Sequence, residues 1–162
     1  MVFGTTILGS NPSAPAKIMN IFLAVKKLFF PFYRSKNIKQ IFTMLNSEED
    51  KPTAMFVGGC VRKFLLNEKI GDIDIATTLT PEEVIKKFKN SNVIVKKTGI
   101  EHGTLTLILE NQNFEITTLR KDISTDGRHA KVSFTDNWDE DSSRRDFSIN
   151  AIYLSHSGKL LT

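Results

Sequence analysis

The stretch that decides the fold runs from Phe56 to Thr77 and reads FVGGCVRKFLLNEKIGDIDIAT. It overlaps an apolar run, Ala54 to Val57, that predicts a short strand ending at the glycine pair Gly58-Gly59. Cys60 to Leu66 has apolar residues at helical spacing, and a second short strand is expected at Asp72 to Ile75. The predicted order is therefore strand, glycine turn, helix and strand.

The second strand carries two carboxylates on one face. Because strand side chains alternate, Asp72 and Asp74 share one face while Ile73 and Ile75 share the other. Taken singly, an Asp-x-Asp pair is usually a solvated strand edge, and a glycine pair is usually only a turn. Together they favour another interpretation, because paired carboxylates repel each other unless a divalent cation bridges them. The pair therefore predicts a metal site.

The glycine pair predicts a phosphate site beside these carboxylates. A junction of strand, Gly58-Gly59 and helix lets backbone N–H groups approach an anion closely. Arg62, one helical turn further along, can reach the same anion. The expected ligand is therefore a phosphate group that carries a metal ion.

Composition points to one ordinary globular domain with a basic surface. The chain has 162 residues, of which 40% are hydrophobic and 25% charged, and its net charge of +4 favours a polyanionic partner without establishing one. The single cysteine, Cys60, excludes an intramolecular disulfide and fits a reducing compartment, which we expect to be the cytoplasm. Ile18 to Phe32 is apolar but too short and interrupted to span a membrane.

The remaining patterns predict a small mixed α/β (α+β) domain, in which a sheet carries the carboxylates and helices pack on one of its faces. Residues 1–34 are expected to be a disordered or weakly helical extension, and residues 35–162 the domain. Helices are predicted after Ser35 and after Thr80, each of which is placed as the N-cap. Further strands are expected at Val93–Val95, Leu105–Leu109 and Phe114–Thr117, with a turn at Glu110–Asn113 between the last two.

Seven ordered motifs resemble one family. The order Gly-Gly-x-Val-Arg and then Gly-Asp-x-Asp-Ile-Ala-Thr resembles the head domain of class II tRNA nucleotidyltransferases, the CCA-adding enzymes, and of bacterial poly(A) polymerases. The resemblance runs from about residue 36 to the C-terminus. The other matching segments are Thr77–Glu83, His102–Thr104, Phe114–Arg120, Asp126–His129 and Glu140–Ala151.

The resemblance implies transfer of a nucleotide from CTP or ATP to an RNA 3′-hydroxyl, most naturally the 3′ end of tRNA. Two Mg²⁺ ions held by Asp72 and Asp74 would serve such a reaction. Glu115 is implied as a third catalytic carboxylate, the alternative being an exposed strand residue paired with a lysine. The nucleotide-binding residues implied are Gly58, Gly59, Arg62, Arg144, Arg145, Asp146 and Asn150. For Arg144–Asp146, the alternative is an ion-pair cluster at the surface.

The chain departs from the family pattern in two respects. Lys63 stands where the family has Asp, which places a basic group near the triphosphate. The neck, body and tail that follow the head in the family are expected to be missing after Thr162. Three readings therefore stay open, namely an active head, with or without a complementing C-terminal chain, an inactive fragment, and a non-catalytic RNA-binding module. CCA addition, A addition and poly(A) synthesis also stay open.

Overall fold

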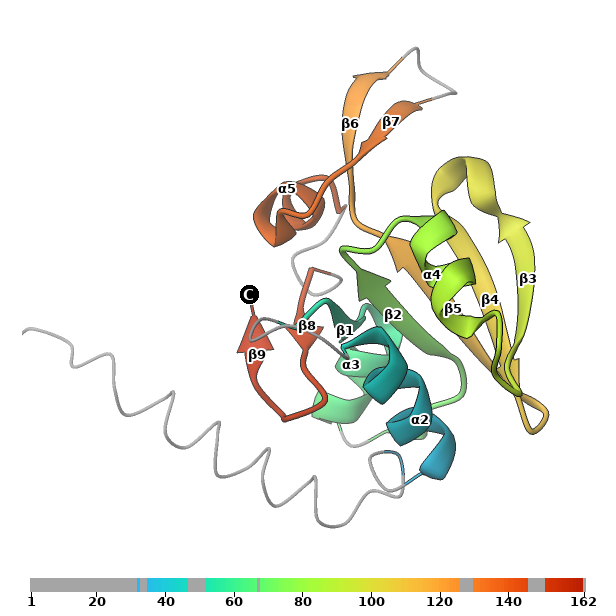
Figure 1. The fold of residues 1–162 in the computed structure, drawn as a ribbon. Helices are drawn as coiled ribbons and strands as arrows, with labels where there is room; N and C mark the ends of the chain where they lie inside the picture. The colour runs from blue at the N-terminus through green and yellow to red at the C-terminus, as the bar shows by residue number, and fades with distance from the viewer. Residues whose placement is uncertain are drawn as a thin grey trace, which may run out of the picture.

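The computed structural model describes residues 32, 35–46, 52–66, 68–125, 130–145 and 151–161. Within these ranges the chain forms helices and strands in the order shown in Figure 1. The helical elements are α2 (Lys36–Leu45), α3 (Gly59–Leu66), α4 (Pro81–Phe88), the 3-10 turn η2 (Ile100–His102) and α5 (Trp138–Ser143). The strands are β1 (Ala54–Val57), β2 (Ile73–Thr77), β3 (Ile94–Gly99), β4 (Thr104–Leu109), β5 (Gln112–Thr118), β6 (Arg120–Thr125), β7 (Ala130–Phe134), β8 (Tyr153–Leu154) and β9 (Leu160–Leu161).

In the described ranges a seven-stranded sheet has the order β3-β4-β5-β2-β1-β8-β9, and β6 and β7 form a separate two-stranded sheet. Only β2 and β5 pair in parallel within the large sheet, and α4, β3 and β4 connect them. The mixed α/β class expected from the sequence is confirmed. The strand order places β2, which carries Asp74, in the interior of the sheet between β5 and β1.

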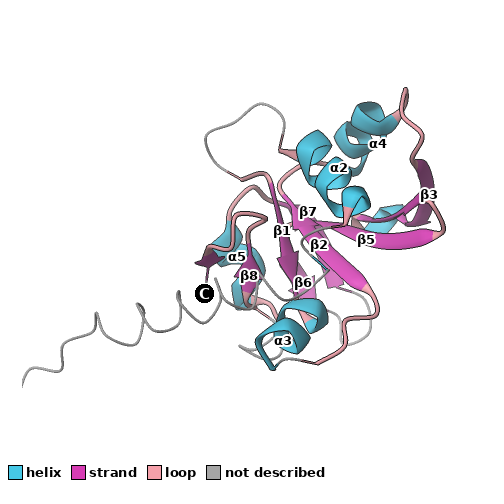
Figure 2. Ribbon diagram, turned by 90° about the horizontal axis from the view of Figure 1, so that it is seen from below, coloured by secondary structure: helices cyan, strands magenta, loops and turns pink. Residues whose placement is uncertain are grey.

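The helices α2, α3 and α4 pack into one core on one face of the sheet, as predicted, and Figure 2 shows α2 and α4 side by side. Along β1, Ala54 and Phe56 pack into the large core on that face, whereas Met55 and Val57 belong to a smaller cluster on the other. Trp138 of α5 packs against this smaller cluster. All four residues of β1 are buried, because both faces of the strand are covered.

Helix starts follow the sequence signals closely. Thr80 caps α4 in a complete capping box, since its hydroxyl accepts from the Glu83 N–H and the Glu83 carboxylate accepts from the Thr80 N–H at 2.8 Å. Ser35 occupies the N-cap position of α2, but its side chain makes no capping hydrogen bond. The buried stripe of α2 is the predicted one: Ile38, Ile41, Phe42 and Leu45.

Strand boundaries differ from the expected ones by a few residues. The turn between β4 and β5 is only Glu110 and Asn111, which have φ of 48° and 62°, so β5 already begins at Gln112. A two-residue turn with two positive φ angles matches the twist of a hairpin and lets both strands run to the turn. The strand expected at Val93–Val95 is β3, displaced to Ile94–Gly99, and Asp72 lies just before β2.

The hairpin of β6 and β7, helix α5 and the short strands β8 and β9 were not predicted. The hairpin stands away from the large sheet (Figure 1). Its Phe134 lies against Gly103, whose φ is +79° and where an added Cβ would come within 2.7 Å of the Phe134 ring. The Phe32 ring packs against the Phe56 ring at a tilt of 46°, with centroids 4.6 Å apart. The rest of the predicted extension 1–34, apart from Phe32, and the loop Asp126–His129 lie outside the described residues.

The described helices include none with the length and apolar character that a membrane span requires.

Candidate nucleotide and metal site

Two carboxylates lie side by side on neighbouring strands of the sheet. The parallel register of β2 and β5 places Asp74 directly opposite Glu115. The flanking residues of both strands, Ile73 and Ile75 among them, are buried in the core under the helices. Because alternate residues face opposite sides, Asp74 and Glu115 project from the other face of the sheet. The structure therefore brings together two residues that are far apart in the chain.

The glycine turn lies against the Asp74 carboxylate. Gly58 follows β1 with a φ of +67°, a left-handed conformation that favours glycine, and α3 begins at Gly59. A Cβ added to Gly58 would lie 3.9 Å from Oδ2 of Asp74, and one added to Gly59 would lie 4.0 Å from the same atom. The start of α3, whose backbone N–H groups attract anions, therefore faces the same space as the carboxylate.

The Asp74 carboxylate is in an unfavourable electrostatic position. Burial raises its pKa above the ordinary value, and the negative charges of Glu115 and Asp72 raise it further. The positive charges of Arg145 and Lys63 lower the pKa in part. No hydrogen bond or ion pair from another described residue reaches the carboxylate oxygens. A half-buried carboxylate so placed fits the role of a cation ligand.

Lys63 is a basic residue of α3 where the family pattern has Asp. Because its charge lowers the pKa of Asp74, the replacement makes the surroundings of the carboxylate more positive and leaves the carboxylate itself in place. Arg62, the neighbouring residue predicted to bind phosphate, lies half-buried on α3, and its N–H donates to the Gly58 carbonyl at 3.0 Å.

The carboxylates fit Mg²⁺ better than they fit a metal enclosed by protein ligands. In the part of the chain that the structure describes, no three His, Cys, Asp or Glu side chains form a group able to hold a metal ion alone. Mg²⁺ is typically held by one or two carboxylates, with water and substrate phosphates completing the octahedron. Asp74, with Asp72 or Glu115 and an adjacent phosphate site, fits that coordination.

A second group of charges forms around Asp141 of α5, which is fully buried. Its Oδ1 accepts from Arg144 Nε at 2.9 Å, and its Oδ2 accepts from Arg145 Nη2 at 2.7 Å. The Tyr153 hydroxyl donates to Oδ2 at 2.6 Å, and the Arg120 backbone N–H donates to Oδ1 at 3.2 Å. One carboxylate thus orders two arginines, a strand residue of β8 and the start of β6.

The charges in this group support one another. Burial alone would raise the pKa of Asp141, but the Tyr153 hydrogen bond and the charges of Arg145 and Arg144 hold it below its ordinary value. Burial also acts to lower the pKa of Arg145, yet the pairing with Asp141 raises it overall. The pKa of Tyr153 is raised, first by burial and then by its hydrogen bond to Asp141. Asp141 is therefore held ionised and Arg145 is held charged at neutral pH.

The predicted site residues fall into two groups, and the positive charge of Arg145 in one group acts on Asp74 in the other. Gly58, Gly59 and Asp74 meet at one point with Glu115 alongside, and Asp72 lies close enough to raise the pKa of Asp74. Arg144 and Arg145 meet at Asp141, and the charge of Arg145 reaches Asp74. The predicted nucleotide-binding residues Asp146 and Asn150 lie outside the described residues.

Sequence reasoning missed Asp141 and Tyr153 as the residues that order the arginines. A signal for Asp141 was present, because Arg144 and Arg145 follow it at i+3 and i+4, the spacing of partners on one helix face. No comparable signal marks Tyr153, since its contact with Asp141 depends on how β8 joins the sheet.

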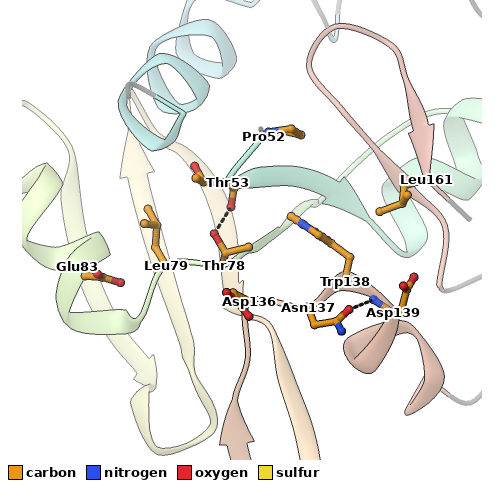
Figure 3. Close-up of a pocket in the computed structure, with 10 residues that line it drawn as sticks. All are labelled: Pro52, Thr53, Thr78, Leu79, Glu83, Asp136, Asn137, Trp138, Asp139 and Leu161. Carbon is orange, nitrogen blue, oxygen red and sulfur yellow. Dashed lines mark hydrogen bonds between the residues drawn. The ribbon is translucent and has the colours of Figure 1, made fainter. Parts of the chain in front are cut away.

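A hollow of about 530 Å³ lies at the opposite ends of β1 and β2 and contains none of the predicted site residues (Figure 3). Thr53 and Thr78, joined by a hydrogen bond, lie on one side, and Trp138 and Asp139 of α5 lie on the other. Because β1 and β2 are antiparallel, with Ala54 opposite Thr77, the glycine turn and Asp74 are at the far ends of these strands.

Residues 54–161 match the family described as the Poly A polymerase head domain. The chain belongs to this family. Among curated relatives it is 40% identical over 146 residues to the human "CCA tRNA nucleotidyltransferase 1, mitochondrial", covering 86% of this chain and 32% of that protein. It is 45% identical over 116 residues to a CCA-adding enzyme of Lactobacillus delbrueckii, covering 70% of this chain and 28% of that protein.

Solved structures of the same kind share the fold. The Bacillus stearothermophilus CCA-adding enzyme, crystallised with CTP, superposes with a TM-score of 0.63 and 35% identity over 75% of this chain and 28% of that one. A tRNA nucleotidyltransferase complexed with a primer tRNA and an incoming ATP analogue gives a TM-score of 0.50 and 28% identity, covering 67% of this chain and 30% of that one. The chain spans about a third of the length of these relatives.

Proposed function

We propose that this head domain transfers a nucleotide from CTP or ATP to the 3′-hydroxyl of an RNA, with the 3′ end of tRNA as the natural acceptor. The observation that carries the proposal is the meeting of Asp74, Glu115 and the Gly58-Gly59 turn in one place. The relatives named for CCA addition, and the related structures with CTP and with a primer tRNA, support the choice of substrates.

The carboxylates form the metal-binding part of the proposed site. Asp72 and Asp74 would hold Mg²⁺, and Glu115, in register with Asp74, would be the third carboxylate. When bound, a pair of such ions stabilises the attacking and leaving oxygens of an in-line phosphoryl displacement. The half-buried position of Asp74 keeps water from screening its charge, which strengthens its attraction for a cation.

The glycine turn and the arginines form the phosphate-binding part. The Gly58-Gly59 turn lies beside the Asp74 carboxylate at the start of α3, where backbone N–H groups suit phosphate oxygens, and Arg62 adds a positive charge from α3. Arg144 and Arg145 approach from the turn that follows α5, with guanidinium planes set by Asp141. The resemblance implies that Asp146 and Asn150, which lie outside the described residues, also belong to the nucleotide-binding set.

We propose that the functional unit is residues 35–162, with residues 1–34 as an extension. Support comes from α2, whose Ile38 and Phe42 enter the same core as Phe56. We also propose that the chain works in a reducing compartment such as the cytoplasm, because Cys60 is a buried thiol. The human relative carries the word mitochondrial in its name, so cell fractionation should compare the two compartments.

The test is incorporation of labelled CTP or ATP into tRNA that lacks its 3′ end, with Mg²⁺ present. We expect incorporation by the chain, none by Asp74→Ala, and normal incorporation by Asp136→Asn, which removes an exposed carboxylate away from the site. Incorporation that appears only when a C-terminal chain of a relative is added would make that chain a required partner. RNA binding that is indifferent to Mg²⁺ and to Asp74→Ala, without transfer, would replace the proposal by a non-catalytic RNA-binding module. A folded chain that shows neither would be an inactive fragment.

A further inference from the structure

The two arginines of the proposed phosphate-binding part are ordered by one carboxylate, that of Asp141, which accepts hydrogen bonds from both. Arg144 and Arg145 each direct Nε and Nη2 at Asp141, so that both guanidinium groups are held along one edge. Among the described residues, neither Nη1 group makes a hydrogen bond. Two positive charges on one carboxylate also leave a net charge of +1, which suits the binding of an anion.

Tyr153 connects this arrangement to the glycine turn. Its hydroxyl donates to Oδ2 of Asp141 and accepts from Arg145 Nε at 3.2 Å. Its backbone pairs with Val57, the residue immediately before Gly58. The Trp138 ring packs edge-on against the Tyr153 ring with centroids 5.0 Å apart, which restricts its orientation. Tyr153 therefore links the position of the arginines to β1, the strand that ends at the glycine turn.

We propose that Asp141 is a positioning residue which, together with the Tyr153 hydroxyl, sets Arg144 and Arg145 at a fixed place relative to the Gly58-Gly59 turn, so that both grip the triphosphate of the incoming nucleotide. The inference rests on the proposed function in that it takes the ligand of this site to be a nucleoside triphosphate. Asp141 acts through the arginines and makes no contact with the substrate.

Simple electrostatics predicts the opposite effect of removing Asp141. Loss of a negative charge next to an anion site should strengthen binding of the anion, as it would at any nearby carboxylate. Positioning predicts weaker binding, because Asn at this place offers an N–H₂ group to arginine donors and leaves part of the pair without an acceptor. The sign of the change in affinity therefore separates the two effects.

The experiment measures binding of inorganic tripolyphosphate, and separately of ATP, to the whole chain in Mg²⁺ by titration calorimetry. Asp141→Asn is expected to weaken both about 10- to 100-fold. Asp139→Asn, on the same helix and exposed, removes the same charge and should leave binding equal or slightly tighter. Tyr153→Phe keeps every charge and should weaken binding by a smaller factor, about 3- to 10-fold.

A double-mutant comparison tests whether Asp141 acts through the arginines or only stabilises the fold. If Asp141 acts through the arginines, Asp141→Asn should have almost no further effect on tripolyphosphate binding in a chain that already carries Arg144→Gln and Arg145→Gln. A second loss of similar size in that background would overturn the proposal. Folded Asp141→Asn that binds tripolyphosphate as tightly as the unmodified chain would also overturn it.

The remaining outcomes separate this inference from the proposed function. If Asp141→Asn does not fold, Tyr153→Phe decides, and unchanged binding by that variant refutes the inference. If the unmodified chain binds tripolyphosphate but transfers no nucleotide, the inference stands and the proposed activity fails. If the unmodified chain binds no tripolyphosphate, both fail.

Discussion

Replacing Asp74 by Asn should make the chain more stable while it destroys the proposed site. Burial and the charges of Glu115 and Asp72 raise the pKa of Asp74, so its ionised form is more costly in the folded chain than in the unfolded chain. Ionisation therefore lowers the free energy of unfolding, a penalty that is absent below the ordinary pKa of 3.8 and complete above the raised value. Asn has nearly the same shape and carries no charge.

Burial is the largest cause of the raised pKa of Asp74, and the strand register gives the part that the charge of Glu115 adds. Like charges directly opposite on neighbouring strands cost up to about 1 kcal/mol, so Asp74→Asn should raise the free energy of unfolding by about 1 kcal/mol at pH 7 and the Tm by about 3 °C. Bound Mg²⁺ should instead favour the unmodified chain over the variant, because only the unmodified chain keeps the Asp74 carboxylate as a ligand. At 100 times its Kd it would stabilise the unmodified chain by about 2.7 kcal/mol, and we expect no such stabilisation of the variant.

The assay is thermal unfolding with EDTA and with Mg²⁺, followed by circular dichroism, at pH 7 and again near pH 3.5. Asp136→Asn serves as the matched control, since it removes an exposed carboxylate and should shift stability by no more than about 0.5 kcal/mol while keeping the response to Mg²⁺. The advantage of Asp74→Asn should shrink at the lower pH. An Asp74→Asn chain that is less stable than the unmodified chain in EDTA, or that Mg²⁺ stabilises equally, would refute the reasoning.

Three further predictions follow from single contacts. In a urea titration, Gly103→Ala should lower the free energy of unfolding by about 2–5 kcal/mol. The φ of +79° costs alanine about 1–2 kcal/mol, and the overlap of its Cβ with the Phe134 ring costs about 1–3 kcal/mol more. The control Gly71→Ala has open space around the added Cβ and should change the free energy of unfolding little. Glu115→Gln should reduce nucleotide incorporation about 10- to 100-fold, and equal initial rates would remove it from the site. Burial raises the pKa of Cys60 from 9.0 to about 11, so the contribution of the neutral thiol to the free energy of unfolding should be complete below pH 9 and lost as the pH passes 11. The reaction of Cys60 with a disulfide reagent at pH 8 should be rapid only after unfolding.

Local signals predicted the local structure well. The apolar run Ala54–Val57, the glycine pair, the stripe of α2 and the N-cap at Thr80 each depend on residues a few positions apart, and each appears where expected. Signals of this kind act through backbone preference and helical or strand periodicity, which neighbouring residues determine. The strand edges moved by a few residues, because pairing with a neighbour decides where a strand begins and ends.

Elements held mainly by partners elsewhere in the chain were missed. Strands β8 and β9 have only two residues each, and they form because β8 pairs with β1 and β9 pairs with β8. The hairpin of β6 and β7 follows directly after β5, and its Phe134 packs on Gly103. Neither has a period long enough to be seen in the sequence, and a two-residue strand is stable only when the rest of the sheet is already formed.

For the site, the sequence by itself predicted the chemistry and determined the family. The types and spacing of Gly58, Gly59, Asp72 and Asp74, with the later motifs, were enough to predict a metal and a phosphate site and to identify the family. Only the tertiary structure decided that Glu115 stands opposite Asp74, through the parallel pairing of β2 with β5. It also decided that Tyr153 closes the group around Asp141. These contacts join segments from different parts of the chain, and their geometry depends on strand order and register, which the packing of the whole core selects.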